Sequence, residues 1–260
     1  MFIMLTNDDG IHAAGLRALY RHLRQAGHEV RVIAPLTEQS AVGHAITVLN
    51  PLRVKEIEEP GFSGLAVSGT PTDCVKLGIT ELLSGRRPDL LISGMNAGAN
   101  VGPDVLYSGT VSAATEGAAM GLPSLAVSHN SRNHVDLESY AEFAVSMAGR
   151  IPWAELPTRR VMNLNLPGCA FSACKGLCLC PQTDVPWSDW YEERLDLRGN
   201  RYWWLTGDIP MDKVKTGTDK YQLEQGWATL TPLKFDFTDQ ACLNELAGAF
   251  PEALHSKSED

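Results

Sequence analysis

The first 35 residues of the chain are the part that most constrains its fold. A short apolar run, Phe2–Leu5, is followed by a polar turn, Thr6–Gly10, which is typical of a buried strand that enters a loop. Apolar residues then recur at helical spacing over Ala13–Gln25, and Glu29–Pro35 is a second strand-like run. A strand, a helix and a strand in so few residues predict a βαβ unit, and therefore an α/β fold with a parallel sheet.

The rest of the chain predicts further elements of this kind. We expect hairpin strands within 51–67, strands at 89–93, 122–128, 161–166 and 228–233, and helices at 70–83, 108–118, 136–150 and 241–250. The composition changes after Cys180, where aromatic residues become frequent. We therefore predict one domain over residues 1–260, with a core of approximately 1–182 and an extension in 183–260.

The predicted extension is rich in aromatic residues. The segments 187–191 and 195–205 resemble two strands joined by a turn at Gly199-Asn200, and four of the six tryptophans lie in them. Aromatic side chains on a projecting hairpin favour a protein–protein interface over a core.

Charge and hydropathy exclude several classes of partner. The net charge is −9 and the sequence pI is about 5.3, so the chain has no general electrostatic attraction to a nucleic acid polymer or an anionic membrane. No segment approaches the ~18 consecutive apolar residues of a membrane span, and no secretory signal is visible. We expect a cytoplasmic protein whose phosphate-binding site, if it has one, is local.

Four of the six cysteines lie close together, at Cys169, Cys174, Cys178 and Cys180. Their spacing differs from the paired knuckles of a structural zinc site. Cys178 and Cys180 alternate with leucines in a strand-like run, so the pattern favours thiols buried as small hydrophobes over zinc ligands.

Two adjacent carboxylates, Asp8 and Asp9, follow the first predicted strand. Like charges this close disfavour each other's ionisation, and a divalent cation with a preference for hard oxygen ligands would relieve that repulsion. Gly10 permits the turn that would bring both side chains to one ion. The alternative is a solvated Asx turn, and this stretch by itself leaves both interpretations open.

Three more polar segments are expected at the same edge of the sheet. Ser40, a candidate oxygen ligand, and His44, a candidate proton carrier, lie in the loop after the second strand. Asn96 lies in a glycine- and asparagine-rich loop, 94–102, whose backbone can approach an anion closely. Ser108-Gly109-Thr110 opens a helix whose free N–H groups suit a phosphate. Dinucleotide and P-loop fingerprints are absent, so a metal ion beside an anion site points to phosphoester hydrolysis.

Several motifs, in order along nearly the whole chain, resemble the SurE family of survival-protein-E nucleotidases. The matching segments are 6–10, 68–75, 93–102, 107–111, 217–219 and 230–233. The resemblance implies a Rossmann-like core and a C-terminal extension that swaps between subunits to give homodimers or homotetramers. It implies a divalent-metal-dependent 5'/3'-nucleotidase that acts on nucleoside monophosphates, with some activity on short polyphosphate.

The resemblance also assigns residues. One Mg²⁺ or Mn²⁺ per subunit would be held by Asp8, Asp9, Ser40 and Asn96, and phosphate would be bound by Asn96, Ser108, Gly109 and Thr110. One departure bears on Ser40, because the family commonly has glycine where this chain has Ala41.

For the mechanism, we expect a metal-activated water to attack the phosphate in line, with Asp8 or Asp9 orienting or deprotonating it. The rival interpretation is a non-catalytic nucleotide- or phosphate-sensing module on the same fold, which would not require the acidic pair. A metal-dependent glycosyltransferase and an aspartyl-phosphate phosphatase are less favoured, because each would use carboxylates separated as Asp-x-Asp.

Overall fold

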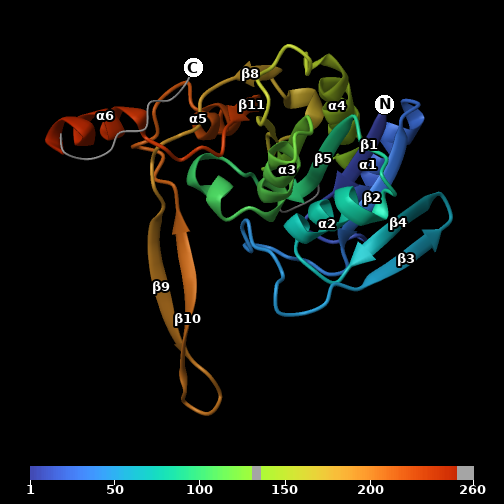
Figure 1. The fold of residues 1–260 in the computed structure, drawn as a ribbon. Helices are drawn as coiled ribbons and strands as arrows, with labels where there is room; N and C mark the ends of the chain where they lie inside the picture. The colour runs from blue at the N-terminus through green and yellow to red at the C-terminus, as the bar shows by residue number, and fades with distance from the viewer. Residues whose placement is uncertain (131–135, 251–260) are drawn as a thin grey trace.

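The computed structural model describes residues 1–130 and 136–250 and is centred on one mixed sheet of nine strands (Figure 1). The order across the sheet is β3-β4-β2-β1-β5-β6-β7-β11-β8. The strands are β1 (Phe2–Thr6), β2 (Glu29–Pro35), β3 (Val54–Glu59), β4 (Phe62–Val67), β5 (Leu90–Ala97), β6 (Ser124–His129), β7 (Val161–Leu166), β8 (Leu177–Leu179) and β11 (Ala228–Leu233). The strands from β4 to β7 in this order run parallel, β3 pairs antiparallel with β4, and β11 pairs antiparallel with β7.

Helices cover both faces of the sheet, as the strand–helix–strand pattern predicts. The first face packs against α1 (Ala14–Gln25) and α4 (Leu137–Arg150), and the second against α2 (Pro71–Leu77) and α3 (Gly109–Ala119). The alternation of β1 explains how a single strand serves both layers, since Ile3 and Leu5 belong to the first core and Met4 to the second. The expected α/β architecture is therefore confirmed.

The parallel order fixes the position of the site. Leu5 pairs with Val32 of β2 on one side and with Ile92 of β5 on the other, so these three strands end at the same edge. A short 3₁₀ segment, η2 (Gly102–Leu106), connects the end of β5 to α3 along that edge. Ligands of open α/β sheets bind at this edge.

One local prediction was wrong. We expected a loop from Gly94 onward, but β5 continues to Ala97 with a bulge between Gly94 and Asn96. A Cβ atom on Gly94 would lie 2.3 Å from the carbonyl oxygen of Val127, so the missing side chain lets β5 approach β6. Glycine here permits close packing of two strands, and composition alone does not distinguish such a glycine from one in a loop.

The aromatic hairpin is confirmed and forms a separate antiparallel sheet of β9 (Ser188–Leu195) and β10 (Arg201–Asp208) that projects from the body (Figure 1). Trp190, Trp203 and Trp204 are 56%, 53% and 59% exposed. An isolated two-stranded hairpin is marginally stable in water, so this one is an element in need of a packing partner.

Residues beyond the hairpin return to the body. β11 lies inside the main sheet between β7 and β8, although the predicted boundary near residue 182 assigns it to the extension. Two helices, α5 (Asp219–Glu224) and α6 (Gln240–Ala249), flank β11 in the sequence. Over the described residues, no helix has the length and apolarity needed to cross a membrane.

The six cysteines are all free. Cys180 is buried, as the alternation with leucine predicts, while Cys178 is half-buried in the short strand β8.

Candidate active site

The acidic pair lies in a tight turn directly after β1. Nδ2 of Asn7 donates a hydrogen bond to the carbonyl oxygen of Gly10 at 2.9 Å, and Gly10 has a φ of +95° that a side chain would strain. The strand has therefore ended, and the chain turns around Asp8 and Asp9, as the metal-site interpretation requires. Asp8 is 4% exposed and Asp9 is half-buried.

The start of α3 packs directly on Asp8. The hydroxyl of Thr110 donates a hydrogen bond to Oδ1 of Asp8. A Cβ atom on Gly109 would lie only 2.7 Å from Cβ of Asp8, so glycine allows this close approach. Ser108 is the N-cap residue, and its Oγ accepts a hydrogen bond from the Val111 N–H at 3.0 Å. The predicted phosphate segment and the predicted metal ligand are thus neighbours, and the Thr110 hydroxyl is directed at Asp8.

The end of β5 contacts the second carboxylate. The Ala97 N–H donates to Oδ2 of Asp9 at 3.2 Å. Beside it, Nδ2 of Asn96 donates to the carbonyl oxygen of Gly98 at 2.6 Å, which leaves the Asn96 Oδ1 as the amide atom suited to a cation. β1 and β5 therefore bring Asp9 and Asn96 to one place at the sheet edge.

Burial shifts the ionisation of both carboxylates. It raises the pKa of Asp9 to about 6, with a further contribution from the negative charge of Asp8. Burial also raises the pKa of Asp8, and the hydrogen bond from Thr110 opposes that shift. Two neighbouring groups that both resist ionisation form a site that a cation would stabilise.

Sequence reasoning missed one member of this cluster, Glu38. Its charge raises the pKa of both Asp8 and Asp9, so its carboxylate belongs to the same electrostatic environment. The signal available in the sequence was its place in the polar loop after β2, two residues before Ser40.

Ser40 lies near the acidic pair through its backbone neighbour. The Gln39 N–H donates to the carbonyl oxygen of Asp8 at 2.8 Å, while the exposed hydroxyl of Ser40 donates to Oε1 of Glu38 at 2.7 Å. Ala41 has a φ of +57°, the left-handed conformation that the family glycine would adopt without strain. This chain therefore keeps the turn after Ser40 despite the alanine.

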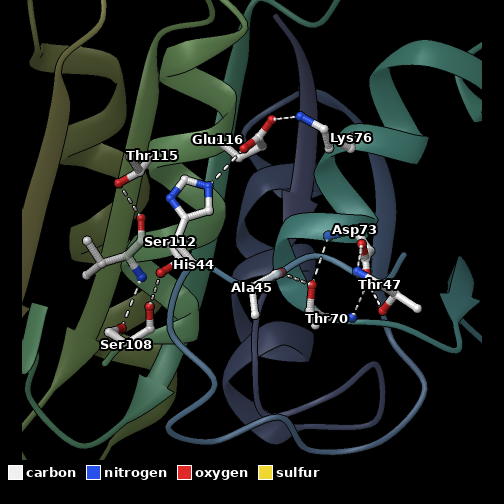
Figure 2. Close-up of polar contacts among 11 residues, drawn as sticks. His44, Ala45, Thr47, Thr70, Asp73, Lys76, Ser108, Ser112, Thr115 and Glu116 are labelled. Atoms are coloured by element: carbon white, nitrogen blue, oxygen red, sulfur yellow. Dashed lines mark hydrogen bonds and ion pairs between the residues drawn. The ribbon is translucent and has the colours of Figure 1, made fainter. Parts of the chain in front are cut away.

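The same loop continues across α3 and α2 (Figure 2). Nε2 of His44 lies 2.8 Å from Oε2 of Glu116 in α3, and Nζ of Lys76 in α2 lies 2.5 Å from Oε1 of the same carboxylate. Contacts with His44 and Lys76 lower the pKa of Glu116.

Two polar contacts with α2 hold the far end of this loop (Figure 2). The Thr70 hydroxyl donates to the carbonyl oxygen of Ala45 at 2.7 Å, and the Thr47 N–H donates to Oδ1 of Asp73 at 2.9 Å. The His44 ring is thus paired with Glu116 of α3. Residues 43–47 form a strap that is fixed to both α2 and α3.

The donor set suits a hard cation rather than zinc. Within residues 1–130 and 136–250, no three His, Cys, Asp or Glu side chains are grouped so that they could hold a metal. A metal at the sheet edge would therefore depend on two carboxylates and on neutral oxygens such as those of Asn96 and Ser40. Mg²⁺ and Mn²⁺ accept such a set, and usually keep several water ligands.

Comparisons with known proteins give one consistent result. The family model described as "Survival protein SurE" matches residues 3–189. The chain is 58% identical over 247 residues to a protein named "5'-nucleotidase SurE" from Nitratidesulfovibrio vulgaris, covering 95% of this chain and 91% of that one. It is 61% identical over 246 residues to a protein of the same name from Oleidesulfovibrio alaskensis, covering 95% of each chain.

A solved structure agrees with these sequences. The crystal structure of the SurE protein from Aquifex aeolicus superimposes with a TM-score of 0.83 at 31% identity, over 96% of this chain and 99% of the other.

Proposed function

Because this chain belongs to the SurE family, we propose that it is a nucleotidase that hydrolyses nucleoside monophosphates to nucleoside and phosphate. Support from relatives comes from the name 5'-nucleotidase, which proteins 58% and 61% identical to this chain carry. The main structural support is the contact between Thr110 and Asp8. It places a helix N-terminus, whose free N–H groups can bind phosphate, directly beside the acidic pair. A sensing module would need the helix start but not the two carboxylates.

The proposed cofactor is one Mg²⁺ or Mn²⁺ per subunit, held by Asp8, Asp9, Asn96 and Ser40. When bound, such an ion supplies a Lewis acid that neutralises phosphoryl charge and makes water a better nucleophile. Asp8, Asp9 and Asn96 are supported by their meeting at one edge of the sheet. Ser40 is supported by the contact of its neighbour Gln39 with Asp8.

The chain's own groups would bind the phosphate and move the proton. The first N–H groups of α3, at Gly109 and Thr110, would bind the phosphoryl oxygens with the positive end of the helix dipole behind them. Asn96 would complete this contact from β5. Asp9, whose pKa burial and the Asp8 charge raise to about 6 in the metal-free chain, or its neighbour Asp8 would orient the attacking water or accept its proton.

The test is phosphate release from protein stripped with a chelator. We expect no release from 5'-AMP without metal, and release once Mn²⁺ or Mg²⁺ is added. The 3'-AMP and tripolyphosphate reactions would show whether the proposed 3'-nucleotidase and polyphosphatase activities are present. Asp8→Asn should abolish release, while Asp212→Asn, at an exposed position outside the site, should retain it. Folded wild-type protein that is inactive with every metal would favour the phosphate-sensing module.

We also propose that the exposed hairpin makes this protein a homodimer or homotetramer. The support is the aromatic surface of β9 and β10, which nothing in the described chain covers. Light scattering of wild type and of a variant with 188–208 replaced by a short turn should give an oligomer and a smaller species respectively.

A further inference from the structure

The connection between β5 and α3 is held at Gly102 by residues from the far end of the chain. The Gly102 N–H donates to Oδ2 of Asp219 at 2.9 Å, and its carbonyl oxygen accepts from Nε2 of Gln182 at 2.5 Å. Gly102 has a φ of +52°, and a Cβ atom there would lie 2.3 Å from Cγ2 of Thr183. The N–H of this residue is therefore bonded to the start of α5, while its carbonyl oxygen and the space beside it are occupied by the segment after β8.

Asp219 makes this contact from a fully buried position at the start of α5. Its second oxygen, Oδ1, accepts hydrogen bonds from the N–H groups of Thr183 and Lys220, both at 2.7 Å. The two oxygens thus accept from donors in different parts of the chain. An asparagine has only one acceptor oxygen on its amide, so it cannot replace both contacts.

A second contact, from Trp187 in the segment after β8, holds η2 at Asp104, two residues after Gly102. Nε1 of Trp187, at the base of the hairpin, donates to Oδ1 of Asp104 at 2.5 Å. The carbonyl oxygen of Asp104 in turn accepts from the N–H groups of Tyr107 and Ser108, at 3.0 and 3.1 Å. Ser108 is the N-cap of α3, so these contacts lead directly to the segment that would bind phosphate.

The start of α3 is packed tightly against Asp8. Gly109 packs so closely on Asp8 that even a Cβ atom would collide with it, and Thr110 is hydrogen-bonded to the same carboxylate. A shift of η2 would therefore move Ser108, Gly109 and Thr110 relative to the sheet edge. The acidic pair itself is fixed by β1 and would stay in place.

We propose that Asp219 is a positioning residue for the reaction, which sets the start of α3 through Gly102 and η2. This inference rests on the proposed function for the identity of the bound group, and it goes beyond it in assigning a role to the 217–219 motif. Asp219 lies 117 positions from Gly102 in sequence and touches none of the candidate ligands of metal or phosphate that we name.

The test compares Asp219→Asn with Asp239→Asn. Asp239 is the exposed N-cap of α6, where Oδ1 accepts the Cys242 N–H at 3.0 Å, so the control makes the same Asp→Asn change at a helix start that, among the described residues, has no hydrogen bond with Gly102 or η2. We expect Asp219→Asn to weaken the binding of inorganic phosphate about tenfold. That is the effect of losing one hydrogen bond between the displaced start of α3 and the charged phosphate. With 5'-AMP as the substrate, KM should rise by a similar factor. In Asp219→Asn the affinity for Mn²⁺ should fall by a smaller factor than the affinity for phosphate, because Asp8, Asp9 and Asn96 stay in place and only the Thr110 hydroxyl contact with Asp8 is disturbed. In Asp239→Asn neither affinity should change.

Two results would overturn the proposal. One is a folded Asp219→Asn protein that binds phosphate as tightly as wild type. The other is an equal loss of Mn²⁺ and phosphate affinity, which would indicate general loosening. If Asp219→Asn does not fold, Trp187→Phe decides, because it removes the Nε1–H bond to Asp104 while keeping an aromatic ring and should weaken phosphate binding in the same direction. An inactive wild type would overturn the proposed function, while phosphate binding would still decide the role of Asp219.

Discussion

The hydroxyl of Thr110 donates a hydrogen bond to Oδ1 of Asp8, so the start of α3 and the end of β1 meet across 102 positions of sequence. Burial raises the pKa of Asp8, and this hydrogen bond lowers it because it stabilises the ionised carboxylate. Thr110 therefore favours the charged form of Asp8, the form in which a carboxylate binds a divalent cation.

The first prediction concerns Thr110→Val, which keeps the shape of the side chain and removes the hydroxyl. Without the hydroxyl, the ionised form of Asp8 loses a hydrogen bond of the kind that contributes about 1.5–3 kcal/mol, so the proton on Asp8 is harder to displace. Because Mn²⁺ binds the ionised carboxylate, we expect it to bind at least about tenfold more weakly at pH 7. Titration calorimetry measures this directly. Thr115→Val is the matched control, since the Thr115 hydroxyl in the same helix donates to the carbonyl oxygen of Val111. Unchanged Mn²⁺ affinity in Thr110→Val would contradict the role given to this contact.

The second prediction concerns the pH dependence of stability without metal. Burial and the Asp8 charge raise the pKa of Asp9 from its usual 3.8 to about 6 in the folded chain. Between these two values the folded protein binds more protons than the unfolded one, so Asp9 lowers the free energy of unfolding as the pH rises, and the loss is complete above about pH 6.

Asp9→Asn removes this contribution. We expect the metal-free variant to be more stable than wild type at pH 7.5, with the difference shrinking toward pH 4. Urea unfolding in the presence of a chelator measures it, with Asp212→Asn as an exposed control. A variant less stable than wild type at pH 7.5 would show that Asp9 is not destabilised by its surroundings.

Local patterns in the sequence predicted much of this architecture. The periodicity over residues 2–35 is enough to give β1, α1 and β2, because each of these elements depends on residues that are neighbours in the chain. The parallel order then brings the ends of β1 and β5 together, and it is this order that predicts Asp8, Asp9 and Asn96 at one edge.

The contacts that the sequence could not reveal are the long-range ones. Nothing near Thr110 specifies Asp8 as its partner, nothing near Asp219 specifies Gly102, and the charge of Glu38 reaches the acidic pair only in the folded chain. The loop predicted at Gly94 was wrong for a related reason, since the missing side chain of Gly94 makes room for Val127 on another strand.

The third prediction concerns Ala41, which adopts a φ of +57° beside the candidate ligand Ser40. The left-handed conformation costs an L-residue roughly 1–2 kcal/mol, and the greater freedom of glycine in the unfolded chain offsets part of the gain from its removal. We therefore expect Ala41→Gly to raise the free energy of unfolding by about 0.5–1 kcal/mol. Chemical denaturation measures the change. Ala45→Gly, in the same loop but not among the positive-φ residues, should give no such gain.

The last prediction concerns Glu116, whose carboxylate joins the strap to α2. Its side chain is 9% exposed, and its oxygens lie 2.8 Å from Nε2 of His44 and 2.5 Å from Nζ of Lys76. These contacts lower its pKa below the usual 4.5, with the His44 hydrogen bond as the largest cause. The folded chain then binds fewer protons than the unfolded chain at acid pH, so the stabilisation is present above about pH 4.5 and is lost as the pH falls through the folded-state pKa.

Glu116→Gln should therefore destabilise the protein at pH 7 by about 1.5–3 kcal/mol, the range for a hydrogen bond to a charged group, and by much less near pH 3.5. Glu142→Gln, at an exposed position of α4, should have little effect at either pH. Hydrogen exchange adds a local readout, since a strap released from Glu116 should exchange faster at the Gly43 N–H, which donates to the carbonyl oxygen of Tyr107 at 3.0 Å. Equal destabilisation at both pH values would mean that Glu116 acts through packing, because only the charged contacts to His44 and Lys76 disappear when the carboxylate is protonated.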